Sequence, residues 1–148
     1  MTDLHAQPTG PSGHRSTGPS TNTGAGRVLV AVYGVFALAA TARASVQLLT
    51  RFEEAPLAYL LSALAGLIYI VATITLARGT RASRRLALVA ILIELGGVLT
   101  VGTLSVVDPE AFPRATVWSV YGIGYGFVPL VLPILGLAWL WHIRSTTS

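Results

Sequence analysis

Four long apolar segments constrain this chain more than any other feature. They cover residues 28–49, 57–77, 86–107 and 118–141 and contain almost no charged side chains. A helix rises about 1.5 Å per residue, so about 20 residues cross the roughly 30 Å hydrocarbon core of a bilayer. In that core, a helix lets a single segment satisfy its own backbone hydrogen bonds. The sequence therefore predicts an all-α membrane protein with four transmembrane helices.

The composition supports a membrane protein and excludes several kinds of chemistry. Of the 148 residues, 53% are hydrophobic and 11% are charged, whereas soluble domains carry about 25% charged residues. Cysteine is absent, which excludes disulfides, thiolate nucleophiles and cysteine metal ligands. All ten basic residues are arginine, a usage typical of GC-rich bacterial genomes. They lie beside apolar runs, a position that favours membrane orientation over nucleic-acid binding.

The connections between the spans predict how the helices are arranged. The linking segments 50–56, 78–85 and 108–116 are short, and short links make consecutive helices antiparallel neighbours. We therefore expect an up-down-up-down four-helix bundle over residues 27–143, followed by a short tail at 144–148. Residues 1–26 are rich in Gly, Pro, Ser and Thr, and such segments cannot bury enough apolar surface to order themselves. We expect that tail to be disordered.

The distribution of arginine predicts the orientation, because cytoplasmic segments of membrane proteins are enriched in basic residues. Seven arginines lie on one predicted side of the membrane and two on the other. The seven are Arg15, Arg27, Arg78, Arg81, Arg84, Arg85 and Arg144, and the two are Arg51 and Arg114. Both termini and the arginine-rich middle loop are therefore expected in the cytoplasm. Tryptophan favours the headgroup level, so we expect Trp118 at the outer interface and Trp139 and Trp141 at the inner one.

A second topology stays open at the first span. Arg27, an apolar run and then Ala42-Arg43-Ala44 resemble a signal peptide with its small-residue cleavage site. Cleavage after Ala44 would leave three spans and an amino end outside the cell. The apolar residues that follow, among them Val46 and Leu48, favour a continuous helix instead.

Arg43 and Glu94 are the ionisable side chains that fall well inside the predicted spans. A charge near the bilayer centre costs about 2.5–3.5 kcal/mol on insertion scales, and such groups usually face the bundle interior. Glu94 lies about 12 Å in from the cytoplasmic side and Arg43 about 22 Å in, at the helical rise. One hypothesis is an intramembrane Arg43–Glu94 pair, or Glu94 acting as a proton or cation site. The other is that Arg43 reaches the outer headgroups while Glu94 stays neutral or bonds a hydroxyl.

Small and polar residues share helical faces, which is how membrane helices approach one another. Proline removes a backbone donor and bends a helix, so the fourth span is expected to curve or to line a cavity near Tyr125. Gly122 and Gly126 form a GxxxG pattern in the same span. The candidate packing or cavity residues are Ser62, Gly66, Gly122, Tyr125, Gly126, Pro129 and Pro133.

These features predict a non-enzymatic membrane component. Hydrolysis in a membrane needs a nucleophile with a base, or a metal held by several ligands, and no such pattern is present, so we expect no cofactor and no metal. The leading hypothesis is an accessory or assembly component that packs against itself or a membrane protein partner. The alternative is a small transporter or channel subunit that uses Glu94 and the bent fourth helix. The arginine-rich loop (Arg78, Arg81, Arg84 and Arg85) is also a candidate site for anionic lipid.

The four spans, the arginine-rich loop and the ending ATVWSVYGIGYGFVPLVLPILGLAWLW give the chain a general likeness to known proteins. It resembles small four-span integral membrane proteins of actinomycetes over about residues 27–143. The resemblance implies a four-span membrane fold. It implies no activity, cofactor or site residue.

Overall fold

The computed structural model describes residue 10 and residues 24–146. Four long helices lie in this part of the chain: α1 (Gly24–Thr50), α2 (Pro56–Arg78), α3 (Arg81–Val107) and α4 (Val128–Ser145). Three short 3-10 segments connect them: η1 (Phe52–Glu54), η2 (Pro109–Ala111) and η3 (Ser119–Tyr125). No strand occurs in residues 24–146, which confirms the all-helical prediction. The expected disorder falls on residues 1–26, of which only residues 10 and 24–26 are described.

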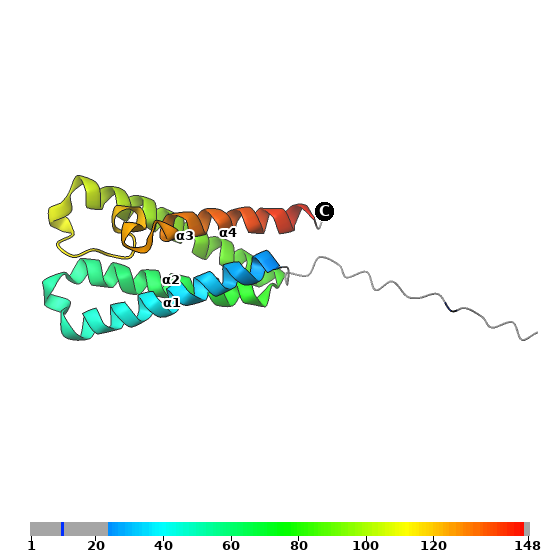
Figure 1. Cartoon of the computed structure of the whole chain (residues 1–148), viewed down its shortest axis with the longest axis horizontal. Helices are drawn as coiled ribbons and strands as arrows, with labels where there is room; N and C mark the ends of the chain where they lie inside the picture. The colour runs from blue at the N-terminus through cyan, green and yellow to red at the C-terminus, as the bar shows by residue number, and fades with distance from the viewer. Residues whose placement is uncertain (1–9, 11–23, 147–148) are drawn as a thin grey trace, which may run out of the picture.

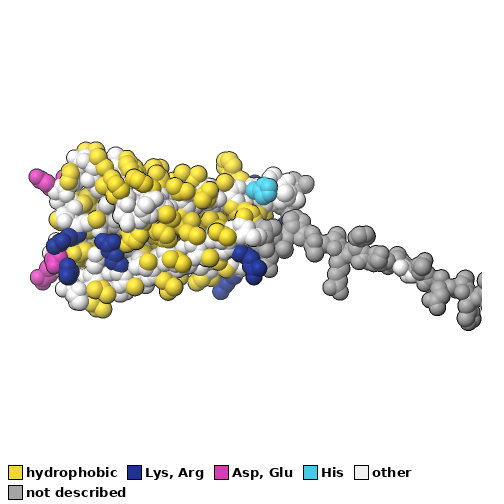
Figure 2. Space-filling view, viewed as in Figure 1, with side chains coloured by type: hydrophobic (Ala, Val, Ile, Leu, Met, Phe, Trp, Pro, Cys, Tyr) yellow, Lys and Arg dark blue, Asp and Glu magenta, His cyan; other side chains and the backbone are white. Residues whose placement is uncertain are grey.

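Each of the four long helices is long and apolar enough to cross a membrane, by length and composition. Large apolar side chains cover much of the outside of the molecule (Figure 2). Leu49, for example, is 86% exposed and Leu38 is 76% exposed. An apolar exterior of this kind is favourable in lipid and unfavourable in water. These features indicate a multi-pass membrane protein.

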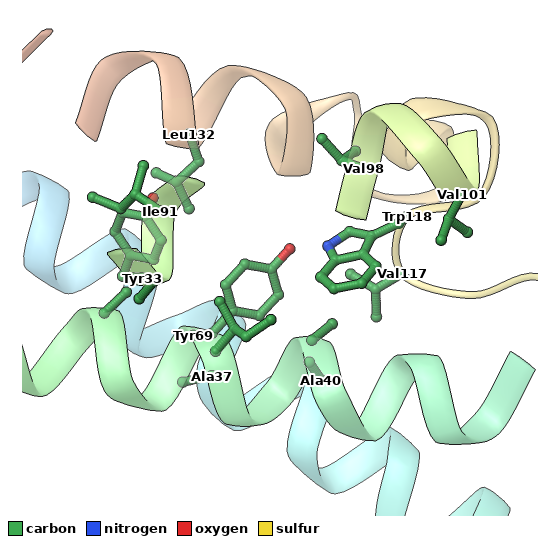
Figure 3. Close-up of a cluster of buried hydrophobic side chains, with 14 of the residues drawn as sticks. Tyr33, Ala37, Ala40, Tyr69, Ile91, Val98, Val101, Val117, Trp118 and Leu132 are labelled. Carbon is green, nitrogen blue, oxygen red and sulfur yellow. The ribbon is translucent and has the colours of Figure 1, made fainter. Parts of the chain in front are cut away.

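The four helices lie alongside one another, with the start of α1 and the end of α4 at the same end of the molecule (Figure 1). We call this the terminal end, and the opposite end, which carries η1 and η2, the loop end. α1 packs mainly along α2, and α3 contacts both α2 and α4. The core between them contains aromatic and branched side chains together with small residues, including Tyr33, Tyr69, Ile91, Val98 and Trp118 (Figure 3).

Interior glycines allow the close contacts of this core. A Cβ atom at Gly97 would lie 2.7 Å from Cζ3 of Trp118, and one at Gly102 would lie 2.6 Å from Cδ1 of Tyr121. On α2, a Cβ at Gly66 would lie 3.0 Å from Oγ1 of Thr41. Small residues let membrane helices approach closely. Here two of the three glycines make room for the ring of an aromatic residue rather than for a second helix.

The fourth predicted span begins ten residues later than the sequence suggests. Its expected range is 118–141, but α4 starts at Val128, and the preceding residues form η3 and a turn. Val120, Tyr121 and Phe127 have positive φ values of 48°, 58° and 61°. Gly122, Gly124 and Gly126 lie within five residues of one another, and glycine in a helix interior costs about 1 kcal/mol relative to alanine. Apolar composition therefore predicted helix where clustered glycines favour a turn.

Hydrogen bonds from hydroxyl groups hold this non-helical segment, residues 116–127, against α3. Oγ of Ser105 accepts a 2.8 Å bond from the backbone N–H of Val120, and Thr103 and Tyr121 share a 2.9 Å hydroxyl bond. Within the segment, Oγ1 of Thr116 accepts from the N–H of Trp118 at 3.1 Å. Irregular backbone is tolerated at membrane depth when its polar groups are satisfied in this way.

The position of Trp118 also differs from the expected one. The sequence places it at the outer membrane interface, yet its side chain is 2% exposed and packs over Gly97. The expectation of an interface anchor is wrong, because the turn at residues 116–127 directs the indole ring inward.

The contact between Gly97 and Trp118 gives a test with a built-in control. We expect Gly97→Ala to lower the free energy of unfolding by about 1–3 kcal/mol, because the rigid indole ring must shift. Gly96→Ala, at the preceding residue, should leave the free energy of unfolding unchanged or slightly raised, since an added Cβ meets no atom within 4 Å. Unfolding in mixed detergent micelles measures both. Equal effects of the two variants would contradict the packing described here.

Candidate functional site

Glu94 lies at the centre of the bundle. It is the fourteenth of the 27 residues of α3, and its side chain is 0% exposed. One carboxyl oxygen, Oε2, accepts a 2.9 Å hydrogen bond from the hydroxyl of Tyr33 on α1. This bond links two helices and orients the carboxyl group. Buried polar groups normally have such partners, because an unpaired group in an apolar interior is costly.

Three polar atoms around this bond have no hydrogen-bond partner. They are Oε1 of Glu94, the hydroxyl oxygen of Tyr69 and the indole nitrogen Nε1 of Trp118. Tyr69 interacts electrostatically with Glu94, and its hydroxyl is within reach of only a weak hydrogen bond with the indole of Trp118. Figure 3 shows its hydroxyl and the indole nitrogen pointing toward one another. Leaving a buried donor or acceptor unsatisfied costs about 1–3 kcal/mol, so a bound proton or small polar species would stabilise this grouping.

We use the name polar centre for Tyr33, Tyr69, Glu94 and Trp118. Apolar core residues surround it, among them Ile91, Val98 and Leu132 (Figure 3). Electrostatic interactions are stronger in such a low-dielectric setting than in water. The carboxyl oxygen and the tyrosine hydroxyls supply acceptors, and the indole and hydroxyl groups supply donors. Chemically, the centre can accept a proton or coordinate a small cation through oxygen atoms.

Arg43 has a different partner. Its Nη1 donates a 2.9 Å hydrogen bond to the hydroxyl of Tyr125, and its Cζ lies 5.9 Å from the centroid of the same ring. This geometry combines a hydrogen bond with a cation–π contact. Each of the two intramembrane ionisable residues is thus bonded to a tyrosine. The structure does not bring Arg43 and Glu94 together as a pair.

A series of ring contacts connects Arg43 with the polar centre. The ring of Tyr125 lies 5.7 Å from that of Phe36, and Phe36 lies 5.9 Å from Tyr69 in an edge-to-face arrangement. Tyr69 in turn lies 6.3 Å from Tyr33. Aromatic pairs at these distances add to the energy of burial. The non-helical segment therefore contributes Trp118 to the polar centre, and its Tyr125 is connected to the centre through Phe36.

A pocket of about 730 Å³ opens near the loop end beside Arg43. Two of its arginines have side-chain partners. Arg114 forms a 3.3 Å ion pair with Glu54, and Arg43 donates a hydrogen bond to Tyr125. Oε1 of Gln47 is buried there without a partner. The pocket is lined by Ala42, Arg43, Val46, Gln47, Arg51, Tyr59, Arg114 and Ala115.

The other candidate residues fall into four groups. Ser62 and Gly66 are buried on α2, and the Ser62 hydroxyl bonds the carbonyl of Ala58. Gly122 and Gly126 have φ values of 81° and 62°, so their GxxxG spacing marks turns and not a helix surface. Pro129 and Pro133 are buried in α4. The arginines of the middle loop end α2 at Arg78 and begin α3 at Arg81, Arg84 and Arg85.

Sequence reasoning identified Glu94 but missed the residues around it. Tyr33 and Tyr69 are not among the candidate residues of the sequence analysis, and Trp118 is expected there at the interface. A usable signal was present, since a buried tyrosine or tryptophan usually needs a partner for its polar atom. Tyrosines in the middle of aliphatic spans therefore indicate a polar group elsewhere in the membrane.

The Tyr33–Glu94 bond can be tested by a double-mutant cycle. Tyr33→Phe and Glu94→Met, alone and combined, should give a coupling energy of about 0.6–1.7 kcal/mol, the range for side-chain bonds between membrane helices. Tyr69→Phe is the matched control. The hydroxyl of Tyr69 lies toward Nε1 of Trp118 and makes no hydrogen bond to Glu94, so the coupling energy between Tyr69→Phe and Glu94→Met should be smaller. A coupling energy near zero would contradict the bond.

Known proteins give no further guide to this site. No protein-family model matches the chain, and neither a curated protein nor a solved structure matches it. The chemistry of the polar centre, the non-helical segment and the arginine-lined pockets is therefore the basis for a function.

Proposed function

We propose that this chain is a non-enzymatic multi-pass protein of the cell membrane that takes up a proton or small cation at Glu94. In this function it acts as a small transporter or as a channel subunit. The observation that carries the proposal is the half-paired carboxyl group. Tyr33 holds one oxygen of Glu94, while the other is buried in the middle of the bundle without a hydrogen bond.

The energetic cost of this arrangement favours a functional role. Acidic residues at mid-membrane depth are rare, and they commonly mark ion or proton pathways. A carboxyl group retained only to join α1 to α3 would be better stabilised with both oxygens bonded, because an unpaired buried acceptor costs about 1–3 kcal/mol. One fixed oxygen and one unpaired oxygen instead suit a group that binds and releases a proton or cation.

The non-helical segment supports the same proposal. Broken helices at membrane depth are typical of transporter binding sites, where backbone groups line the path of the substrate. Residues 118–127 replace the first part of the fourth apolar segment with irregular backbone, which contributes Trp118 to the polar centre and is connected to Tyr69 through Tyr125 and Phe36. Tyr125 also bonds Arg43, a residue that lines the pocket near the loop end.

We further propose an up-down-up-down arrangement in the membrane with both termini in the cytoplasm. The support is the arginine bias, since Arg78, Arg81, Arg84, Arg85 and Arg144 all belong to helix ends or tails at the terminal end. Basic residues are retained on the cytoplasmic side during insertion.

The orientation can be tested because the chain contains no cysteine. We expect a single cysteine at Glu110, in the exposed η2 segment, to react with a membrane-impermeant maleimide in intact cells. A single cysteine at Thr146 should react only after permeabilisation. The reverse pattern would overturn the orientation. The mass of the extracted protein separately reports cleavage after Ala44.

The transport proposal predicts loss of flux on removal of the Glu94 carboxyl group. Wild-type protein in vesicles should dissipate a pH gradient, followed with an internal pH-sensitive dye, or a sodium or potassium gradient, followed with a dye selective for that ion. Glu94→Gln should reduce that flux to the level of empty vesicles. Glu110→Gln is the control, because it removes a carboxyl group from an exposed 3-10 turn. Flux equal in wild type and Glu94→Gln would contradict the proposal.

A second candidate is the accessory or assembly component. The GxxxG pattern of Gly122 and Gly126 does not support it, because those glycines form turns. Gly96 and Thr100, however, are exposed one helical turn apart on α3, and an added Cβ at Gly96 meets no atom within 4 Å. A partner helix can approach such a surface closely. Absence of flux in wild type, together with a cross-linked assembly that Gly96→Leu abolishes, is the result that this candidate predicts.

A further inference from the structure

A second arginine-lined pocket lies at the terminal end, between the start of α3 and the end of α4. Its volume is about 560 Å³. We call it the inner groove. Four of its residues are basic and three are large and apolar. It is lined by Arg81, Arg84, Arg85, Leu88, Leu140, Trp141 and Arg144.

The positive charge of the inner groove lies at the end of α3 where the helix dipole disfavours it. Arg81, Arg84 and Arg85 lie in the first two turns of α3, where the helix dipole adds partial positive charge. The first turn of α3 contains no acidic residue. An anion at this place would relieve the repulsion among the arginines and the dipole, so the sequence of α3 is suited to a negatively charged ligand.

Acidic side chains in the described part of the chain do not neutralise this charge. Glu53, Glu54, Asp108 and Glu110 belong to the loop end, and Glu94 is buried in the core. In Figure 2 acidic side chains lie at the loop end, while basic side chains lie at both ends. The ion pair formed within residues 24–146 joins Arg114 to Glu54. The pocket near the loop end therefore has an acidic side chain beside it, whereas the described acidic side chains lie away from Arg81, Arg84 and Arg85.

One guanidinium of the inner groove has a nitrogen whose hydrogen-bonding capacity is unused among the described residues. Nε of Arg84 is buried and has no hydrogen-bond partner. The nearby hydroxyls of Thr80 and Ser83 are bonded to each other, and Oγ1 of Thr80 also caps α3 by accepting from the N–H of Ser83. A guanidinium prefers oxyanions such as phosphate, which it can bind through two parallel hydrogen bonds.

The apolar residues decide which source of phosphate fits. Leu88 and Leu140 provide aliphatic walls, and Trp141 is 72% exposed at the end of α4. A free phosphate ion would gain nothing from these side chains. A phospholipid would place its acyl chains along them and its headgroup among the arginines, and basic pockets between helices bind lipid headgroups in this way.

We propose that the inner groove binds an anionic phospholipid, with its phosphate against Arg84 and Arg85 and an acyl chain along Leu88, Leu140 and Trp141. This site is separate from the polar centre, so it does not depend on any transport role of Glu94. The ligand class is a phosphate diester with a net negative headgroup, such as phosphatidylglycerol.

Native mass spectrometry of the full chain in mild detergent, titrated with phosphatidylglycerol or phosphatidylcholine, tests the proposal. Wild type should bind phosphatidylglycerol in preference. The double variant Arg84→Gln/Arg85→Gln should weaken that binding roughly thirtyfold, from about fivefold for each arginine near an anionic lipid. The matched control Arg51→Gln/Arg114→Gln removes the same charge at the loop end and should leave the affinity unchanged.

Further measurements distinguish a bound phospholipid from a free phosphate ion and check that every variant folds. Leu140→Ser should weaken phosphatidylglycerol binding without altering the charge, and circular dichroism should show wild-type helix content in every variant. Displacement of the lipid by inorganic phosphate would mean that the groove takes a free anion, which would overturn the proposal. Equal affinity for the two lipids, or equal loss in the loop-end control, would also overturn it.

Discussion

The bond between Tyr33 and Glu94 is the interaction on which the centre of the bundle depends. A carboxyl group in the middle of four apolar helices is unfavourable unless another helix supplies a donor, and the hydroxyl of Tyr33 on α1 supplies it to Glu94 on α3. The surrounding core contains Tyr69 and Trp118, whose polar atoms lie toward the same region. Packing and polar chemistry are therefore not separable here, because the same aromatic rings fill the core and form the polar centre.

The non-helical segment is a consequence of how α3 is built. Gly97 and Gly102 leave room on one side of this helix, and the rings of Trp118 and Tyr121 occupy that room. Ser105 then satisfies the backbone N–H of Val120. Glycines, a hydroxyl and two aromatic rings together allow irregular backbone where a fourth full-length helix was expected. The arrangement moves the start of α4 and brings Trp118 from the predicted interface to the interior.

The two arginine-lined pockets differ in the residues that surround their arginines. The pocket near the loop end has Glu54 beside Arg114 and Tyr125 beside Arg43, whereas the inner groove collects basic residues of α3 and α4 next to apolar walls. A groove that combines several arginines with an apolar wall suits an anionic lipid.

The sequence by itself determined the four apolar helices, the arginine bias and the two costly residues, Arg43 and Glu94. These follow from local composition, since hydropathy and charge can be read along a single segment. Only the tertiary structure decided their partners, because the bonded residues are 61 positions apart for Tyr33 and Glu94 and 82 apart for Arg43 and Tyr125. The same holds for the inner groove, where Arg144 joins arginines of α3. Apolar composition also cannot distinguish a helix from a glycine-rich turn that hydroxyls on a neighbouring helix stabilise, and for that reason residues 118–127 were predicted as helix.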